Sequence, residues 1–198
     1  MHRPPRVPAL QGCAVLVPVK AFARAKARLA PQLDPTRRAE LARAMATHVV
    51  RAAAPLPVAV VCDDDDVAAW AADEGAIVLH EPGRGLNGAV ETGVAWLGAA
   101  GAVEVLVAHG DLPLARGLGR LAGFAGITLV PDRAGDGTNI ACVPVSAGFR
   151  FSYGPRSFSR HQAEARRVGL ELRVVRDPEL TLDIDRPADL TLAPGPWT

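Results

Sequence analysis

The sequence has very little lysine, asparagine and tyrosine. Its 198 residues include 20 arginines but only two lysines, Lys20 and Lys26, two asparagines, Asn87 and Asn139, and one tyrosine, Tyr153. Heavy use of alanine, arginine, glycine and proline is typical of a GC-rich coding sequence, in which arginine readily replaces lysine. The few lysines and asparagines that remain therefore direct attention to the loops that contain them.

Cysteine is also scarce, and its pattern excludes several site types. Cys13, Cys62 and Cys142 are odd in number, lie inside apolar runs and have no zinc-ligand spacing. The interpretation that fits these facts is buried thiols in a reducing compartment. We therefore expect a cytoplasmic protein.

The chain lacks a strong charge of either sign and lacks a long apolar run. Its net charge is +1 and no basic face is evident, so nucleic acid is not an expected partner. The apolar run Cys13–Val19 is too short for a signal peptide and contains Pro18. No segment is long enough to span a membrane, so we expect no membrane partner.

What the sequence does contain is an alternation of strand-like and helical segments. A length of 198 residues suits one domain, 1–198, with flexible tails at about 1–11 and 192–198. The expected strands are Cys13–Val19, Val58–Cys62, Ile77–His80, Glu104–Ala108, Ile127–Val130, Asn139–Pro144, Leu172–Val175 and Leu180–Ile184. The expected helices are Thr36–Ala53, an Asp-capped helix ending at Ala72, Leu86–Ala100 and Pro155–Val168. This order predicts an α/β three-layer sandwich with a mostly parallel, mixed sheet.

Chemically distinctive residues follow the predicted strands, where α/β folds bind ligands. The first such loop holds four cations within nine residues: Lys20, Arg24, Lys26 and Arg28. They suit a nucleoside triphosphate, which carries about four negative charges. The alternative is a solvated basic helix start. The loop is not a P-loop, because the glycines are missing.

Carboxylates follow other strands. Asp111 comes soon after the run Glu104–Ala108, where it could bind a metal ion or cap a helix after Pro113. In an extended segment, Asp183 and Asp185 would point to the same side, about 7 Å apart. Like charges on one face repel unless a cation lies between them. Together the three aspartates predict a site for one or two magnesium ions.

Hydroxyl and glycine groups form a third set. Thr138 stands beside a glycine, and Gly154 and Ser157 lie at the expected start of a helix. They could bind a small phosphate or carboxylate, or they could form ordinary turns and caps. Asn87 could read a nucleobase edge with its amide, or it could cap a helix.

Six stretches resemble one family in the same order along the chain. They are PVKAFARAKARLAP, GLNGAVETG, HGDLPL, PDRAGDGTN, FSYGPRSFSRHQAEA and DIDRPADL. They resemble the guanylyltransferases of coenzyme F-420 biosynthesis, which activate phosphoenolpyruvate or 2-phospho-L-lactate. The resemblance implies a Rossmann-like nucleotidyltransferase fold, GTP as substrate and Mg²⁺ as cofactor.

The resemblance also implies roles for individual residues. Thr138, Gly154 and Ser157 would bind the phospho-acid. Asp111, Asp183 and Asp185 would bind metal, while Lys20, Lys26 and Arg28 would hold the triphosphate and act in catalysis. Asn87 joins the nucleotide-binding set.

We expect transfer of GMP from GTP to phosphoenolpyruvate, giving enolpyruvyl-diphospho-guanosine and pyrophosphate. The alternatives are 2-phospho-L-lactate as the acceptor, a sugar-phosphate nucleotidyltransferase, and a non-catalytic nucleotide-binding regulator. A downstream transferase of the F-420 pathway is a candidate partner. The oligomeric state is open, with a homodimer as one option.

Overall fold

The computed structural model describes residues 10–81 and 83–193. The tails predicted at about 1–11 and 192–198 therefore lie mostly outside the described residues. At their inner ends, Leu10 is buried and its N–H donates a hydrogen bond to the carbonyl oxygen of Ala100. Leu192 ends a short 3₁₀ helix that begins at Pro187.

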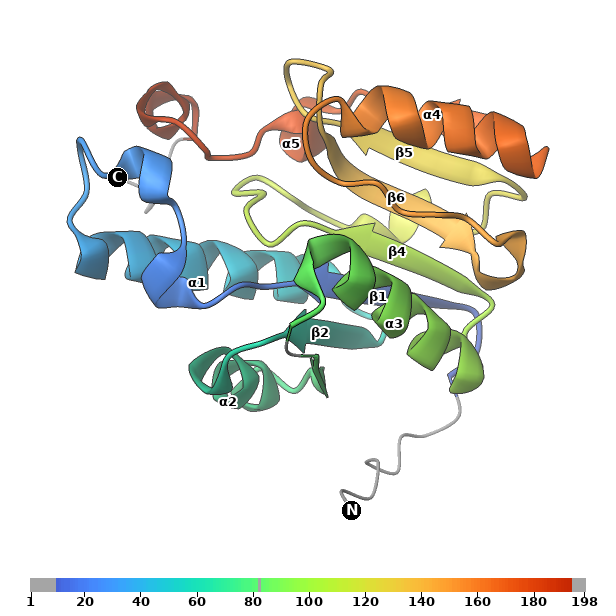
Figure 1. Ribbon diagram of the computed structural model, residues 1–198, viewed down its shortest axis with the longest axis horizontal. Coiled ribbons are helices and arrows are strands. Elements are labelled where there is room, and N and C mark those ends of the chain that lie inside the picture. Colours follow the sequence, from blue (N-terminus) through green and yellow to red (C-terminus); the bar gives the residue numbers. More distant parts are fainter. Residues whose placement is uncertain (1–9, 82, 194–198) are drawn as a thin grey trace.

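Seven of the eight predicted strands form one sheet, and the sheet is mixed, as predicted (Figure 1). The strand order is β3-β2-β1-β4-β6-β5-β7. Strand β6 runs antiparallel to β4 and β5, and the other pairs are parallel. The bounds are β1 Cys13–Pro18, β2 Val58–Cys62, β3 Ile77–His80, β4 Glu104–Ala108, β5 Ile127–Pro131, β6 Thr138–Pro144 and β7 Leu172–Val174. The chain order reverses between β1 and β4, which opens a crevice at their carboxyl ends.

The helices begin at recognisable start signals. Asp34 caps α1 by accepting a hydrogen bond from the Arg37 N–H, and Asp64 caps α2 by accepting one from the Val67 N–H. The four predicted helices are confirmed within about two residues at each end. The bounds are α1 Pro35–Ala52, α2 Asp65–Asp73, α3 Gly85–Ala99, α4 Ser157–Val168 and the short α5 Pro178–Thr181.

The prediction of a strand at Leu180–Ile184 is wrong. Asp177 accepts a hydrogen bond from the Glu179 N–H, and Pro178 occupies the first turn of α5. Both are helix-start signals, and they outweigh the short apolar pattern that follows. The chain after α5 remains extended without pairing in the sheet, and the Ile184 N–H donates instead to the Asp111 carbonyl oxygen.

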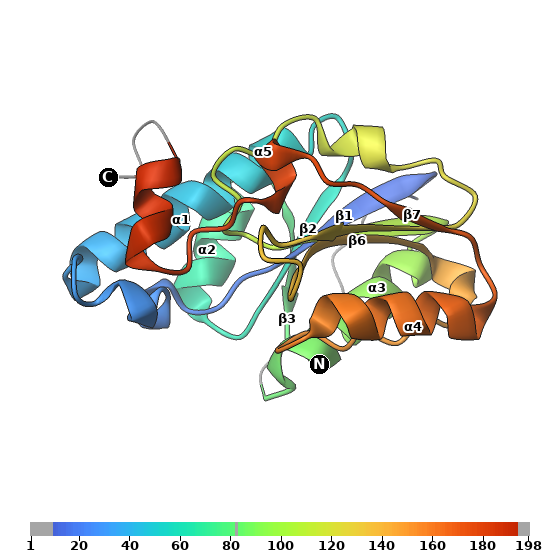
Figure 2. The ribbon, with the colours of Figure 1, turned by 90° about the horizontal axis from the view of Figure 1, so that it is seen from above.

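Helices cover both faces of the sheet, which confirms three layers (Figure 2). Alternate residues of β1 point to opposite faces. Val15 joins the core under α1 and α2, which includes Trp70. Leu16 joins the core under α3 and α4, which includes Phe158. Each fully buried aliphatic side chain stabilises the fold by roughly 1.5–3 kcal/mol.

A third, smaller core cluster holds the chain after α5 against the loop after β1. Leu29 from this loop, Met45 from α1 and Ile184 are all fully buried in it. Apolar packing therefore brings together two segments that are more than 150 residues apart in sequence. The same packing places Lys26 beside Asp185.

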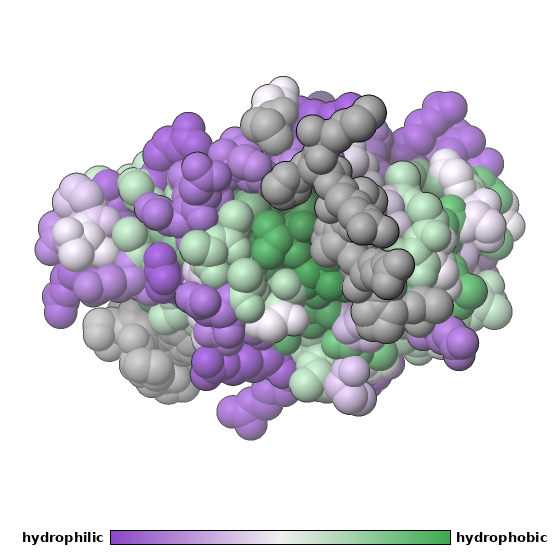
Figure 3. All heavy atoms as spheres, turned by 90° about the horizontal axis from the view of Figure 1, so that it is seen from below, coloured by the Kyte–Doolittle hydropathy of each residue, from purple (hydrophilic) through white to green (hydrophobic). Residues whose placement is uncertain are grey.

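One face of the molecule presents both polar and apolar side chains (Figure 3). Figure 3 shows hydrophilic side chains over much of one face, with hydrophobic ones gathered near its centre. Among residues 10–81 and 83–193, the exposed large hydrophobic side chains are Val103, Val174 and Leu192. In the same ranges, no helix has both the length and the apolar character needed to cross a membrane.

Candidate functional site

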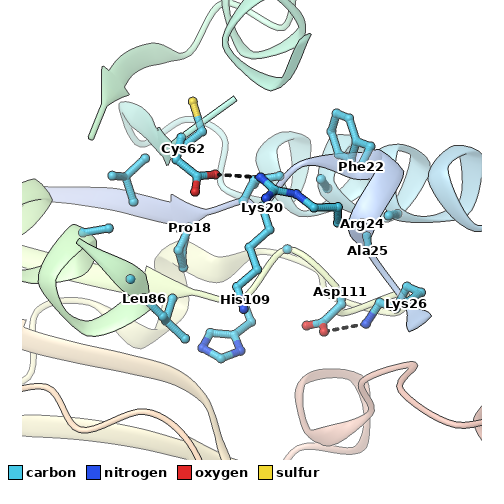
Figure 4. Close-up of a pocket in the computed structure, with 18 of the residues that line it drawn as sticks. Pro18, Lys20, Phe22, Arg24, Ala25, Lys26, Cys62, Leu86, His109 and Asp111 are labelled. Carbon is cyan, nitrogen blue, oxygen red and sulfur yellow. Dashed lines mark hydrogen bonds and ion pairs between the residues drawn. The ribbon is translucent and has the colours of Figure 1, made fainter. Parts of the chain in front are cut away.

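A cavity of about 650 Å³ opens at the carboxyl ends of β1, β2 and β4 (Figure 4). Its size falls within the range of small-molecule sites. The loop after β1, the loop after β4 and the segment after α5 all contribute to its wall. The charged or ring-bearing residues of that wall include Lys20, Arg24, Lys26, His109, Asp111 and Asp185. The crevice expected from strand order is therefore also where the unusual residues gather.

The three aspartates predicted to bind metal lie together. One carboxylate oxygen from each of Asp111, Asp183 and Asp185 lies within 4.8 Å of the other two. The alternative that Asp111 caps a helix is not what the structure shows, because the next helical turn begins only at Leu118. Three carboxylates from two distant segments thus meet at one point.

Two of the predicted triphosphate-binding cations contact this cluster. The Lys26 Nζ atom lies 2.7 Å from Oδ2 of Asp111 and 3.1 Å from Oδ1 of Asp185. Arg28 lies 3.0 Å from the second oxygen of Asp185. Figure 4 shows Lys26 reaching Asp111 across the edge of the cavity. The Lys26 side chain is 8% exposed and that of Arg28 is 71% exposed, so these contacts differ greatly in desolvation.

Lys26 has an unusual backbone as well. Its φ is 54°, in the left-handed region that costs a non-glycine residue roughly 1–2 kcal/mol. Arg156, with φ of 57°, is the other non-glycine residue with this conformation in the described chain. Both lie in loops that carry predicted binding residues. Backbone strain of this kind is common where a fold must aim a side chain.

The charges in the cluster shift one another's pKa values. Burial alone would lower the pKa of Lys26, but the charges of Asp111 and Asp185 outweigh it and raise the pKa. Burial alone would raise the pKa of Asp111, but the charge of Lys26 outweighs it and lowers the pKa. Burial, followed by the charges of Asp111 and Asp185, raises the pKa of Asp183 to about 7. Lys26 therefore satisfies two carboxylates and leaves the third poorly compensated.

The cluster has the properties of a divalent-cation site. The Oδ1 atom of Asp111 is buried and has no hydrogen-bond partner within the described residues. Burial raises the pKa of Asp183, and the neighbouring negative charges of Asp111 and Asp185 raise it further. Magnesium binds one or two carboxylates together with phosphate oxygens from a substrate. The residues present therefore fit this ion.

The other two cations of the loop after β1, Lys20 and Arg24, form no ion pair with the three clustered aspartates. Lys20 is exposed, lines the cavity and forms no ion pair with any residue in the described ranges. Arg24 lies 3.9 Å from Asp63, the residue that follows β2. Lys20 is thus the cation most free to meet a ligand.

The predicted acid-binding residues form a separate group beside β6. Thr138 and Ser157 are each 2% exposed, and neither lines the main cavity. The Ser157 Oγ atom accepts a hydrogen bond from the Thr138 N–H at 3.0 Å. Ser157 is the first residue of α4, and no side chain caps this helix, so the capping alternative is not observed. Gly154 has a φ of 117°, which only glycine adopts readily.

Asn87 makes a contact that sequence reasoning missed. Its Oδ1 accepts from the Tyr153 N–H at 2.6 Å, and its Nδ2 donates to the Tyr153 carbonyl oxygen at 3.3 Å. The amide therefore holds the loop that contains Gly154. This contact gives Asn87 a structural role, and nucleobase reading stays a prediction.

Two histidines near these groups were also missed. His109 lines the cavity, and its ring centroid lies 4.8 Å from that of Tyr153. Burial lowers the pKa of His109. The His109 Nε2 and the Tyr153 hydroxyl are buried without a hydrogen-bond partner in the described part of the chain. A histidine between a buried strand and Gly110-Asp111 was the available signal.

The second histidine, His161, joins Thr138 to the loop before α4. Its Nδ1 lies 3.0 Å from Oγ1 of Thr138, and its Nε2 accepts from the Ser152 N–H at 2.8 Å. A spacing of four residues places His161 on the same face of α4 as Ser157. No role for His161 was predicted from the sequence.

The cysteines are buried and unpaired in the structure, as predicted. Cys13 and Cys142 lie near Glu104 in the sheet, so these three side chains form a second group of potential metal ligands. However, the Glu104 carboxylate already accepts a hydrogen bond from the Gly123 N–H. A hydrogen bond with Cys13, together with burial, raises the pKa of the Cys142 thiol, so the thiol stays protonated. This group packs the sheet interior.

Comparison with known families and curated proteins agrees with the geometry. The family described as guanylyl transferase, CofC-like, matches residues 13–192. A protein from Sphaerobacter thermophilus named phosphoenolpyruvate guanylyltransferase is 39% identical over 184 residues, with 88% of this chain and 89% of that protein covered. A protein of the same name from Streptomyces coelicolor is 38% identical over 200 residues, with 93% and 92% covered.

Solved structures with low sequence identity share the fold. One from Desulfovibrio desulfuricans, described as a nucleotide-diphospho-sugar transferase, has a TM-score of 0.75 at 17% identity and covers 91% of this chain and 85% of its own. A nucleotidyl transferase from Methanothermobacter has a TM-score of 0.64 at 16% identity, with 93% and 96% covered. The predicted nucleotidyltransferase fold is confirmed.

Proposed function

Because this chain belongs to the family of CofC-like guanylyl transferases, we propose that it transfers GMP from GTP to phosphoenolpyruvate. The products are enolpyruvyl-diphospho-guanosine and pyrophosphate. The enzyme is a nucleotidyltransferase, and its family fits coenzyme F-420 biosynthesis. The names of the curated relatives support phosphoenolpyruvate as the acceptor.

The observation that carries this proposal is the meeting of three carboxylates at the edge of a cavity, two of which are paired with Lys26. Nucleotidyl transfer brings two phosphate groups together, so their repulsion must be neutralised. A cluster of carboxylates suits this task if it recruits a divalent cation. The cations of the loop after β1 add positive charge beside it.

Asp111, Asp183 and Asp185 are the residues that would hold Mg²⁺. When bound, the ion neutralises phosphate charge and polarises the phosphoryl oxygens. The free Oδ1 of Asp111 supports this assignment, as does the raised pKa of Asp183. A bound Mg²⁺ carries two positive charges where the Lys26 ammonium carries one. It would therefore neutralise more of the negative charge of the three carboxylates than Lys26 does.

The transfer itself needs positioning more than proton chemistry. A phosphate oxygen of the acid attacks the α-phosphorus of GTP, the new O–P bond forms, and the bond to the β-phosphate oxygen breaks. Lys20, Lys26 and Arg28 would hold the triphosphate and stabilise the charge on the leaving pyrophosphate. A phosphate is already a nucleophile at neutral pH, so no side chain has to remove a proton.

The acid would be held by Thr138, Gly154 and Ser157, the group that lies beside β6. Hydroxyl groups and a close glycine backbone suit phosphate or carboxylate oxygens. The hydrogen bond between the Thr138 N–H and Ser157 supports this assignment, because it fixes the two hydroxyls relative to each other. The downstream transferase, the homodimer and the cytoplasmic location are further parts of the proposal.

The direct test is an assay of the purified protein with GTP, Mg²⁺ and each candidate acceptor. We expect pyrophosphate release and a new nucleotide product with phosphoenolpyruvate. Faster turnover of 2-phospho-L-lactate would change the acceptor, and turnover of sugar 1-phosphates would replace the proposal. GTP binding without any pyrophosphate release would favour a non-catalytic regulator.

A further inference from the structure

His161 is placed to control the direction of a hydrogen bond. It lies on α4, its side chain is completely buried, and both ring nitrogens have partners. The Nε2 atom is 2.8 Å from the Ser152 N–H, and Nδ1 is 3.0 Å from Oγ1 of Thr138. The ring thus joins β6 to the loop that carries Gly154.

The partners of His161 determine its tautomer. A backbone N–H can only donate, so the Nε2 atom that faces Ser152 must be an acceptor without a proton. A neutral imidazole carries one proton, which must then lie on Nδ1. Burial, followed by the charges of Arg160 and His109, lowers the pKa of His161 to about 4, so the ring is neutral at pH 7. The Nδ1–H group therefore donates to the Thr138 hydroxyl oxygen.

This arrangement leaves the Thr138 hydroxyl proton free. Oγ1 accepts from His161, and no acceptor for its own proton is found within residues 10–81 and 83–193. The neighbouring Ser157 repeats the pattern, because its Oγ accepts from the Thr138 N–H and its proton has no acceptor in the same ranges. Two adjacent hydroxyls thus each keep a proton available for donation. An oxyanion accepts hydrogen bonds and does not donate them. It is therefore a suitable ligand for two hydroxyls that each have a proton to donate.

We propose that His161 is a positioning residue that commits the Thr138 hydroxyl to donate a hydrogen bond to an oxygen of the phospho-acid. The identity of the anion rests on the proposed function, whereas the donor geometry rests on the structure. His161 itself does not touch the substrate. It acts by occupying the acceptor side of Thr138, so that the hydroxyl proton points elsewhere.

The surroundings of His161 support a fixed orientation. The ring packs against Tyr153 at 4.9 Å and Phe149 at 5.6 Å between centroids. The Ser152 carbonyl oxygen is held in turn by Arg160 at 2.7 Å. A ring enclosed in this way cannot turn over without disturbing the loop, so the hydroxyl direction is set before the substrate arrives. Pre-organised donors of this kind lose little entropy on binding.

A matched pair of variants separates this role from a merely structural one. His161→Asn places an amide N–H near the Nδ1 position, which keeps a donor to Thr138 and loses the acceptor for Ser152. His161→Gln places an amide oxygen near the Nε2 position, which keeps the acceptor and loses the donor. Each variant removes one hydrogen bond, and only His161→Gln releases the Thr138 hydroxyl.

We expect His161→Gln to raise the KM for phosphoenolpyruvate about ten- to a hundredfold, since this is the usual cost of one hydrogen bond to a charged group. His161→Asn should raise it less than fivefold. The KM for GTP should change little in both variants. In a Thr138→Val background, His161→Gln should have no further effect on the acid. Equal losses for both substrates in both variants would overturn the proposal.

Two measurements without turnover test the inference even if the proposed function fails. Nitrogen-15 NMR of the substrate-free protein at pH 7 should show His161 as the Nδ1–H tautomer. An Nε2–H tautomer or an imidazolium would overturn the proposal, whether or not the variants fold. Calorimetry with inorganic phosphate should show weaker binding to His161→Gln than to His161→Asn, and equal binding would count against it. A wild-type protein that uses no phospho-acid would contradict the proposed function alone.

Discussion

The charged cluster around Lys26 and the hydroxyl pair beside β6 hold their polar groups in opposite ways. In the charged cluster, Asp185 is 43% exposed and Arg28 is 71% exposed. In the hydroxyl pair, Thr138 and Ser157 are each 2% exposed. The first region uses full charges that range from the buried Lys26 to the exposed Arg28, and the second uses neutral donors in the interior.

This difference implies different ways of meeting a ligand. Asp111 and Asp185 of the charged cluster are already paired with Lys26 and Arg28, so a metal ion or triphosphate must compete with existing contacts. The hydroxyls are fixed by hydrogen bonds on their acceptor sides and keep their protons free. We infer that the charged region supplies most of the rate and exchanges its ion pairs on binding, whereas the hydroxyl region recognises the acid through donors that are already oriented.

The largest effect should come from removing a carboxylate of the charged cluster. Asp111→Asn and Asp183→Asn should each lower turnover about a thousandfold or more, because they remove charge that would hold a metal ion. Steady-state rates at saturating Mg²⁺ are the measurement, with circular dichroism to check the fold. Asp73→Asn, on the exposed end of α2, is the matched control and should keep wild-type rates. Near-normal activity of both site variants would contradict the metal assignment.

The two cations that touch the cluster should differ from each other. Lys26→Met removes a buried ammonium that serves two carboxylates, and we expect about a hundredfold loss of kcat/KM for GTP. Arg28→Met removes an exposed partner and should cost about tenfold or less. Comparing kcat/KM of the two variants at several salt concentrations tests this. If both variants lost the same factor in kcat/KM for GTP, the burial of Lys26 would not be what makes it more important than Arg28.

The hydroxyl variants should affect the acid and spare the nucleotide. Thr138→Val and Ser157→Ala should each lower kcat/KM for phosphoenolpyruvate about ten- to a hundredfold and leave the KM for GTP nearly unchanged. Ser157→Ala also leaves the buried Thr138 N–H without its partner, so unfolding free energy should fall by about 1–3 kcal/mol. Thr138→Ser keeps a hydroxyl and should retain most acid use. A stability loss with unchanged acid kinetics would give the hydroxyls a structural role only.

The smallest expected effect concerns stability without metal. The pKa of Asp183 is raised from 3.8 to about 7, so the folded protein retains a proton that the unfolded chain has lost. Stability is therefore lost as pH rises through this range, and the loss is complete above about pH 7. Asp183→Asn removes this cost and should stabilise the metal-free protein at pH 8 by on the order of 1–2 kcal/mol, allowing for solvent screening.

Thermal melts of wild type and Asp183→Asn at pH 4 and pH 8 check the sign of this effect. The gain should shrink towards pH 4, where wild-type Asp183 is largely protonated. Added Mg²⁺ should raise the wild-type Tm and leave the variant nearly unchanged. A lower Tm for the variant at pH 8 without metal would contradict the account of excess negative charge.

Much of the fold followed from local pattern. Strands β2, β3 and β4 were predicted with their observed bounds, because apolar runs of strand length stand between turn and helix signals. The segment Leu180–Ile184 was wrongly predicted to be a strand. Asp177 and Pro178 start the helix α5, and the alternation of apolar residues that follows conceals this helix in the sequence. Local signals conflicted there, and the capped helix start decided the outcome.

The sequence predicted which carboxylates gather at the site. It did not predict the side-chain contacts that join residues far apart in the chain. The gathering of Asp111, Asp183 and Asp185 was predicted, and Asp111 does follow a strand, β4. Asp183 and Asp185 reach the same place from the segment after α5, which is not a strand. The contacts of Lys26 span 85 and 159 residues, and those of His161 with Thr138 span 23. Such pairings depend on packing between elements, which periodicity and propensity do not encode.

The most direct test of the central claim is to follow the oxygen atoms of the acid. Phosphoenolpyruvate labelled with oxygen-18 in its phosphate group would be incubated with GTP, Mg²⁺ and the enzyme, and both products analysed by mass spectrometry. The account predicts a guanosine diphosphate ester that keeps all of the label and pyrophosphate that contains none. Label in pyrophosphate, or no labelled nucleotide product while GTP is consumed, would contradict it.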